Sequence, residues 1–170
     1  QAALLAPKAT TTAVITGNLD ARGATPAAFD HTNAATYNAT TSMAVFDSQG
    51  NSRTLDLYFR KTGANTFDVY SFLTNLATPP VSTSTTANAT TQLITGLPFT
   101  TAGAYDSAGG GGDKGLQAIA VAAADGVAAI AINLDITGLT QFGSNFAINT
   151  ATQNGYSAGQ LSSIEVSDVG

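Results

Sequence analysis

Strict alternation of apolar and polar residues marks one segment near the middle of the chain. Leucine or phenylalanine stands at every second position of this segment: Leu55, Leu57 and Phe59 alternate with Thr54, Asp56, Tyr58 and Arg60. A period of two is the repeat of a β-strand, whose successive side chains point to opposite faces, whereas a helix repeats about every 3.6 residues. The segment therefore predicts a strand with one face buried in a core.

Polar turns flank this strand on both sides. Ser48 to Asn51 follows a short apolar run, Met43 to Asp47, and Lys61 to Asn65 precedes another, Phe67 to Phe72. The glycine or the asparagine of the first turn can supply the positive φ that a tight bend needs. The three runs therefore predict an antiparallel three-stranded meander.

Further short strands are predicted along the rest of the chain. β-branched and other apolar residues gather at 12–19, 92–99, 146–150 and 161–166. The intervening segments 21–40 and 74–91 have the small, polar composition of loops. The segment 104–115 contains four consecutive glycines and is predicted to be mobile.

The alanine-rich segment 116–136 has two interpretations. Alanine favours a helix, but Ile130, Ile132, Leu134 and Ile136 recur at every second position, and the Asp125-Gly126 pair is a strong hairpin signal. We predict two strands joined at residues 124–126. The whole chain then has about eight or nine short strands and little or no helix, which predicts an all-β antiparallel sandwich or barrel.

Composition narrows the classes of partner and site. Charged residues make up only 10% of the 170 residues, against roughly 25% in an ordinary domain, so the polar surface must be Thr, Ser, Asn and Gln. The net charge of -5 argues against nucleic acid or an anionic membrane as a partner. The absence of cysteine excludes disulfides and thiolate metal sites within the chain. No apolar run approaches the ~20 residues needed to span a bilayer as a helix.

Two sequence features imitate catalytic or nucleotide-binding motifs. His31, the one histidine, lies in a predicted loop without a Gly-x-Ser-x-Gly elbow, and we interpret it as a solvated residue. Gly110, Gly112 and Gly115 spell the dinucleotide fingerprint, with Asp135 twenty residues further on. That motif needs a strand before it and a helix after it, so we interpret the match as accidental.

The carboxylates, sequons and tyrosines also have simple explanations. Asp47 and Asn51 lack the further oxygen ligands of a calcium loop. Asp56 and Asp68 could face each other on neighbouring strands, but we expect both to point to solvent. Two glycosylation sequons, at Asn38 and Asn88, are common by chance in a threonine-rich chain. The tyrosines could line a sugar-binding face, although strand packing explains Tyr58 and Tyr70 more simply; the five are Tyr37, Tyr58, Tyr70, Tyr105 and Tyr156. No residue is predicted to be catalytic, cofactor-binding or a metal ligand.

Several stretches at both ends and in the centre of the chain have a distinctive sequence: residues 8–12 leading to 18–20, 45–51, 57–62, 65–70 and 154–161. These stretches resemble the outer domain of the bacterial flagellar hook protein. The Asp47-Ser48-Gln49-Gly50-Asn51 turn is the most specific of them, although flagellar rod proteins share it. Residues 74–135 show no motif that matches.

The resemblance implies a fold and a division of the chain. The fold is expected to be a flattened β-barrel. Residues 1–12 would be a linker from an inner domain, 13–155 the outer hook β-domain, and 156–170 a return strand and linker toward the inner domain.

The resemblance also implies a structural role without enzymatic activity. Hook subunits are exported by the flagellar secretion apparatus and polymerise outside the cell into a curved tube, a universal joint that passes motor torque to the filament. The partners would be other hook subunits and the hook-cap, rod and hook-filament junction proteins, and the fragment alone would be monomeric. An extracellular carbohydrate-binding or adhesin module is the alternative, and a hydrolase on a β-scaffold is a third possibility. An adhesin would need a coplanar row of exposed tyrosines.

Overall fold

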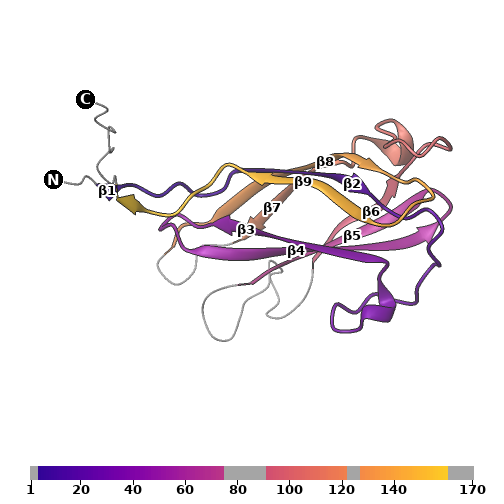
Figure 1. Ribbon diagram of the computed structural model, residues 1–170, viewed down its shortest axis with the longest axis horizontal. Coiled ribbons are helices and arrows are strands. Elements are labelled where there is room, and N and C mark those ends of the chain that lie inside the picture. Colours follow the sequence, from indigo (N-terminus) through magenta and orange to yellow (C-terminus); the bar gives the residue numbers. More distant parts are fainter. Residues whose placement is uncertain (1–3, 75–90, 122–126, 161–170) are drawn as a thin grey trace, which may run out of the picture.

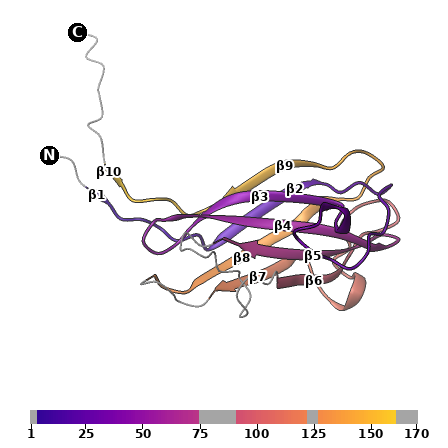
Figure 2. The ribbon, with the colours of Figure 1, turned by 90° about the horizontal axis from the view of Figure 1, so that it is seen from below.

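Two four-stranded sheets packed face to face form the body of the protein. The computed structural model describes residues 4–74, 91–121 and 127–160. A two-stranded extension, β1 and β10, projects from one end of this sandwich (Figures 1 and 2). The described residues thus form an all-β fold, as the alternating segments predict.

The first sheet has the order β3-β4-β5-β6 and is antiparallel throughout. Its first three strands are the predicted meander, and β6 adds the strand predicted at 92–99. The strands are β3 (Ala39–Phe46), β4 (Ser52–Gly63), β5 (Thr66–Leu73) and β6 (Thr91–Pro98). Two tight turns set this register: Gly50 has φ +84° in the first, and Asn65 has φ +58° in the second.

The second sheet has the order β7-β8-β2-β9. Its strands are β2 (Thr12–Asn18), β7 (Leu116–Val121), β8 (Ile130–Thr140) and β9 (Ala147–Gln153). The antiparallel β7–β8 pair confirms two strands for the alanine-rich segment. β2 and β8 pair in parallel, which is the one exception to the predicted antiparallel pairing among the described strands. The two strands lie side by side in one sheet, yet more than a hundred residues separate them in the chain. Their pairing therefore could not be predicted from local sequence.

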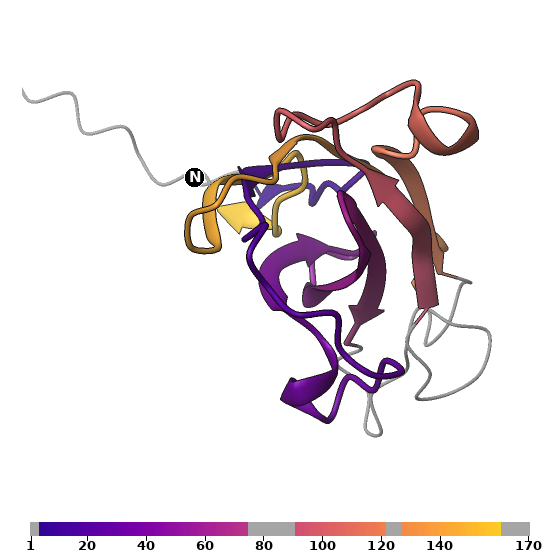
Figure 3. The same ribbon diagram turned by 90° about the vertical axis from the view of Figure 1, so that its right-hand side faces the viewer.

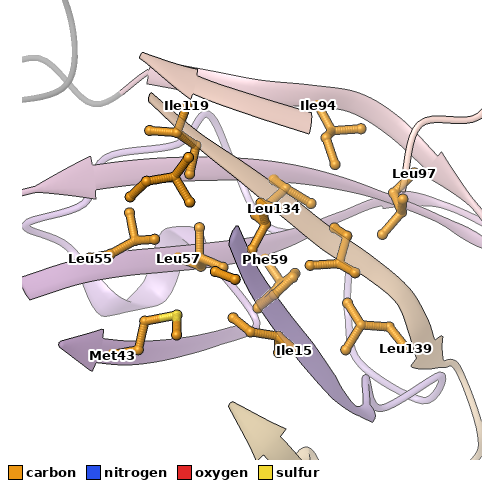
Figure 4. Packing of buried hydrophobic residues seen from close by; sticks show 14 of the residues in the cluster. Ile15, Met43, Leu55, Leu57, Phe59, Ile94, Leu97, Ile119, Leu134 and Leu139 are labelled. Atoms are coloured by element: carbon orange, nitrogen blue, oxygen red, sulfur yellow. The ribbon is translucent and has the colours of Figure 1, made fainter. Parts of the chain in front are cut away.

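The core lies between the two sheets, and Figure 4 shows side chains from both sheets pointing into it. Leu55, Leu57 and Phe59, the alternating residues of β4, are completely buried. They meet Ile15 and Leu134 from the opposite sheet. Burying each such side chain stabilises the fold by about 1.5–3 kcal/mol, so the period-two pattern accounts for why β4 lies at the centre.

The extension is a narrow ribbon that we call the stalk, formed by residues 4–9 and 155–160. β1 (Leu4–Leu5) pairs antiparallel with β10 (Gly159–Gln160), and Lys8 forms a bridge with Tyr156. The chain therefore enters the sandwich and leaves it at the same end, which we call the base end. The opposite end, where the segments 20–38 and 100–115 lie, is the far end (Figure 1).

Two segments predicted as loops have more structure than expected. In 21–40, a short 3-10 helix η1 (Ala34–Thr36) is capped by the Asn33 side chain, and β3 already begins at Ala39. The segment 104–115, which is predicted to be mobile, contains the short 3-10 helix η2 (Gly109–Gly111). Its Tyr105 hydroxyl donates a hydrogen bond to Asp113 and accepts one from Gly115 N. The predicted loop 74–91 beyond Thr74, the 124–126 connection and the strand 161–166 lie outside the described residues. Within the described residues, no helix has the length and apolar character that crossing a bilayer requires.

Candidate functional site: the joint between stalk and sandwich

A buried carboxylate organises the turn between β3 and β4 at the base end. Asp47 is completely inaccessible to solvent and accepts hydrogen bonds from Gln49 N and Asn51 N, both at 3.0 Å. The Asn51 amide and the Arg53 guanidinium add further donors, at 3.1 Å and at 3.0 to 3.1 Å. Burial alone raises the pKa of the Asp47 carboxyl, but the bonds from Asn51, Arg53 and Gln49 outweigh it, so the pKa lies below its usual value. Asp47 is therefore an ionised anchor for residues 47–51.

The 47–51 turn lies against both chains of the stalk. A Cβ placed on Gly50 would lie 2.7 Å from Pro7 Cβ and 2.8 Å from Ala158 N. No side chain fits at such distances, so glycine is required here both for space and for its positive φ. The turn that the sequence predicts as a simple bend is also a contact surface for the stalk.

Side-chain hydrogen bonds tie the stalk to the sandwich just above this contact. Thr10 donates its N–H to Phe46 O at 2.9 Å, and its hydroxyl accepts the Phe46 N–H at 2.9 Å and donates to Gln153 Oε1 at 2.5 Å. Asn154 Oδ1 accepts the N–H groups of Thr11 and Thr12 at 2.8 and 3.0 Å. The entering strand, the leaving strand and β3 are thus joined at one level, and we call this set of contacts the joint.

The 47–51 turn, which lacks the ligands of a calcium loop, lies next to this joint and contacts the stalk. Arg53 forms an ion pair with Asp47, so the positive charge that balances this carboxylate comes from the chain itself. The sequence analysis did not predict this partner. Arg53 stands at an inward-facing position of the alternating strand, and a charged residue at such a position indicates a buried ion pair. Across residues 4–74, 91–121 and 127–160, the structure gathers no group of three or more His, Cys, Asp and Glu side chains that could hold a metal.

The two strand carboxylates do not face each other. Asp56 lies opposite Phe72 in the ladder and contacts the Ser42 hydroxyl, while Asp68 lies opposite Arg60. The expectation that both point to solvent is wrong for Asp68, which is buried, pairs with Arg60 at 3.5 Å and accepts the Gly96 N–H at 2.9 Å. Segment 20–38 lies over this part of the sheet, where Pro26 O and Ala27 O accept hydrogen bonds from Arg60. Asp68 therefore needs partners, and Arg60 and the Gly96 N–H of the neighbouring strand β6 provide them.

An aromatic cluster holds segment 20–38 on the outer face of the first sheet. Phe29 stacks on Tyr70 with ring centroids 3.8 Å apart and meets Tyr58 edge-on, and His31 stacks on Phe72 at 5.2 Å. His31 is therefore a packing residue rather than a solvated one. Figure 3 shows segment 20–38, in indigo and purple, outside the two sheets. The anchor Phe29 was missed because a single phenylalanine in a polar segment carries no periodicity.

The tyrosines do not form a flat row. Tyr37 and Tyr58 meet at 70°, and Phe29 covers Tyr70. Tyr105 is bonded to Asp113, and Tyr156 lies on the stalk. Burial raises the pKa of Tyr58, Tyr70 and Tyr105 above its ordinary value, as expected for packed phenols. The geometry therefore lacks the coplanar row that a sugar-binding adhesin face needs.

The glycine fingerprint and the first sequon are likewise occupied by internal contacts. Gly115 packs against Tyr105 and leads into strand β7 rather than a helix, and Lys114 Nζ donates to Thr95 O at 2.8 Å. The Asn38 amide donates to Ala24 O at 2.8 Å and accepts the Lys61 N–H at 2.6 Å. Asn88 lies outside the described residues.

The outer face of the second sheet differs from that of the first because small residues cover it. Its exposed positions carry threonine, alanine and asparagine, with Val14 and Leu116 as larger apolar groups and Asp135 as a charged one. A shallow groove of about 510 Å³ runs across it, over β2, β7 and β8. A second groove, of about 380 Å³, opens at the far end beside Leu19 and Phe146.

The fold and the joint define a stalked, all-β sandwich domain. The family model described as "Flagellar basal body protein FlaE D2 domain" matches residues 18–156. The chain is 34% identical over 173 residues to the flagellar hook protein FlgE of Escherichia coli K12, and 32% identical over 171 residues to that of Salmonella typhimurium LT2. Each alignment covers 98% of this chain and 39% of the relative, so the chain spans about two-fifths of the length of these curated relatives. Because the family model matches most of the chain, the chain belongs to the family of flagellar basal body FlaE D2 domains.

Proposed function

We propose that this chain is the outer β-domain of a flagellar hook subunit. Residues 13–155 form the domain, 1–12 are the linker from an inner domain, and 156–170 lead back to it. The match to hook proteins over 98% of the chain supports this proposal most strongly. The stalk agrees with it, because β1 pairs with β10, so the entering and leaving chains run side by side.

In this proposal the full-length subunit is a structural protein of the extracellular flagellum, without enzymatic activity. It is exported by the flagellar secretion apparatus and polymerises into the curved tube that passes motor torque to the filament. Its partners are other hook subunits together with the cap, rod and junction proteins of the hook. The isolated domain is a monomer, because assembly requires the rest of the subunit.

The outer face of the second sheet suits a contact that must slide. Rows of subunits in a bent, rotating tube shorten and lengthen in turn, so neighbouring outer domains must break and re-form their contacts. Small uncharged side chains allow wet contacts of this kind. Dense charge of one sign would repel at polymer density. We therefore propose that this face sets hook curvature through weak contacts between domains.

Electron microscopy of hooks tests this proposal. Deleting residues 13–155 from the full-length subunit is expected to leave tubes that assemble but are straighter. A sharper variant places three glutamates on exposed positions of the second sheet, Ala118, Ala131 and Thr152. Its matched control places three on the exposed far-end positions Thr25, Ala28 and Ala35. Straightening by the first set alone supports the proposal, and unaltered curvature in both the deletion and the sheet variant refutes it.

A further inference from the structure

The stalk is a β-ribbon whose ladder is interrupted once. Leu4 pairs with Gln160, Leu5 with Gly159 and Lys8 with Tyr156, and all three pairs keep one register. Lys8 and Tyr156 exchange both backbone hydrogen bonds, at 3.0 and 2.9 Å. Hydrogen-bonded pairs alternate along an antiparallel ladder, so the next one should join residues 6 and 158.

The structure forms no such pair. Ala6, Pro7, Ser157 and Ala158 are all described residues, yet no backbone hydrogen bond crosses the ribbon between them. Pro7 lies between the two hydrogen-bonded positions, so its missing N–H removes no cross-strand bond, but its ring fixes φ at about −65°, outside the usual range of an antiparallel strand. A two-stranded ribbon without cross-strand bonds has little resistance to bending, so these four residues are the weakest point of the stalk.

The 47–51 turn fills one side of this weak point. Gly50 faces Pro7 on the entering chain and Ser157 and Ala158 on the leaving chain, and even a Cβ added to Gly50 would lie within 2.7–3.2 Å of them. The turn cannot easily retreat, because the buried Asp47–Arg53 pair and the bonds from Asn51 hold it in place. On the sandwich side the ribbon is fixed by Thr10 and its bonds to Phe46 and Gln153.

We propose that the stalk bends at residues 6–7 and 157–158 and that the 47–51 turn is a stop that blocks bending toward β3 and β4. The sandwich would then swing from the stalk in one direction only. This inference concerns the mechanics of the chain itself and holds whether or not the outer sheet face sets curvature.

Distance measurements between two spin labels test the stop directly. The chain contains no cysteine, so two introduced cysteines at the exposed positions Leu4, on the stalk, and Ala44, on β3, carry the labels uniquely. A label pair within the sandwich, at Ala44 and Thr150, gives the width expected without bending. The proposal predicts a broader Leu4–Ala44 distribution with a steep edge on the short-distance side.

Two variants move that edge in opposite directions. Gly50→Ala must push the stalk away by about 1 Å at the contact, because carbon atoms settle near 3.5–4.0 Å, and by more at Leu4 further along the ribbon. Pro7→Gly removes the Cβ atom that faces the turn and should extend the distribution to shorter distances. Gly143→Ala is the matched control, since its added carbon meets no atom closer than 3.9 Å, and it should change nothing.

The outcomes separate this inference from a role in stability alone. A purely stabilising turn would lower the melting temperature in Gly50→Ala while leaving the distances unchanged. The proposal is wrong if the Leu4–Ala44 distribution is as narrow as that within the sandwich. It is also wrong if neither folded variant shifts the short-distance edge. If Gly50→Ala fails to fold, Pro7→Gly still decides, because it removes the Pro7 Cβ and so alters only the stalk side of the contact.

Discussion

The two ends of the sandwich each carry an ion pair between an aspartate and a nearby arginine, but in opposite surroundings. At the base end, Asp47 and Arg53 expose 0% and 6% of their side chains, and the pair is 3.0 Å apart. At the far end, Asp20 and Arg22 expose 30% and 58%, with a similar separation of 2.8 Å. Distance alone therefore does not distinguish the pairs; burial does.

The burial of each ion pair determines how strictly it fixes the conformation of the residues around it. A charge without water around it needs every partner in place, so the Asp47 network permits one arrangement of the 47–51 turn. At the far end, long cationic side chains donate hydrogen bonds to backbone carbonyls instead: Lys61 to Ala21 O and Arg60 to Ala27 O. Water can replace those bonds, so the far end tolerates change. Rigidity is concentrated where the sandwich meets the stalk.

Breaking the buried pair should produce the largest effect. Arg53→Met keeps most of the side-chain volume but leaves the Asp47 carboxylate buried without its cation, which is expected to destabilise the domain by about 3–5 kcal/mol. The matched control, Arg22→Met, breaks the exposed pair and should cost far less, because solvent and salt screen these charges. Urea unfolding of both variants at pH 7 measures the difference. Equal losses would show that the two ends do not differ as described.

Removing the aromatic anchor of segment 20–38 should have an intermediate effect. Phe29→Ala deletes the ring that covers Tyr70, and such a stacked pair contributes about 0.5–1.5 kcal/mol beyond the area it buries. The exposed Phe142 provides the control, Phe142→Ala. Because burial raises the pKa of Tyr58 and Tyr70, uncovering them should lower both toward the ordinary value. An ultraviolet titration that matches wild type would contradict a covering role for Phe29.

Local pattern predicted the strands better than it predicted their partners. The alternation of apolar and polar residues was sufficient to predict β4 and β8 as strands, because burial of one strand face produces a period of two in the sequence. The parallel pairing of β2 with β8, the docking of Phe29 and the burial of Asp68 depend on residues distant in the chain, and a single sequence carries no trace of them. The 47–51 turn shows both cases. A positive φ at Gly50 or Asn51 was predicted and Gly50 has it, whereas the contact of the turn with Pro7 and Ala158 was not predicted.

Acid should reveal the smallest difference between the ends. Hydrogen bonds from Arg22 lower the pKa of Asp20 from 3.8 to about 2, so this carboxylate stabilises the fold above about pH 4, and the contribution is lost as the pH falls toward 2. Asp20→Asn removes that contribution, but solvent and salt screen an exposed group, so its melting temperature between pH 2 and 7 should follow wild type closely. The pKa of Asp47 is also lowered, which gives the buried pair the same sign of pH dependence. If Asp20→Asn abolished most of the acid loss of stability, the far end rather than the base end would hold the electrostatically critical carboxylate.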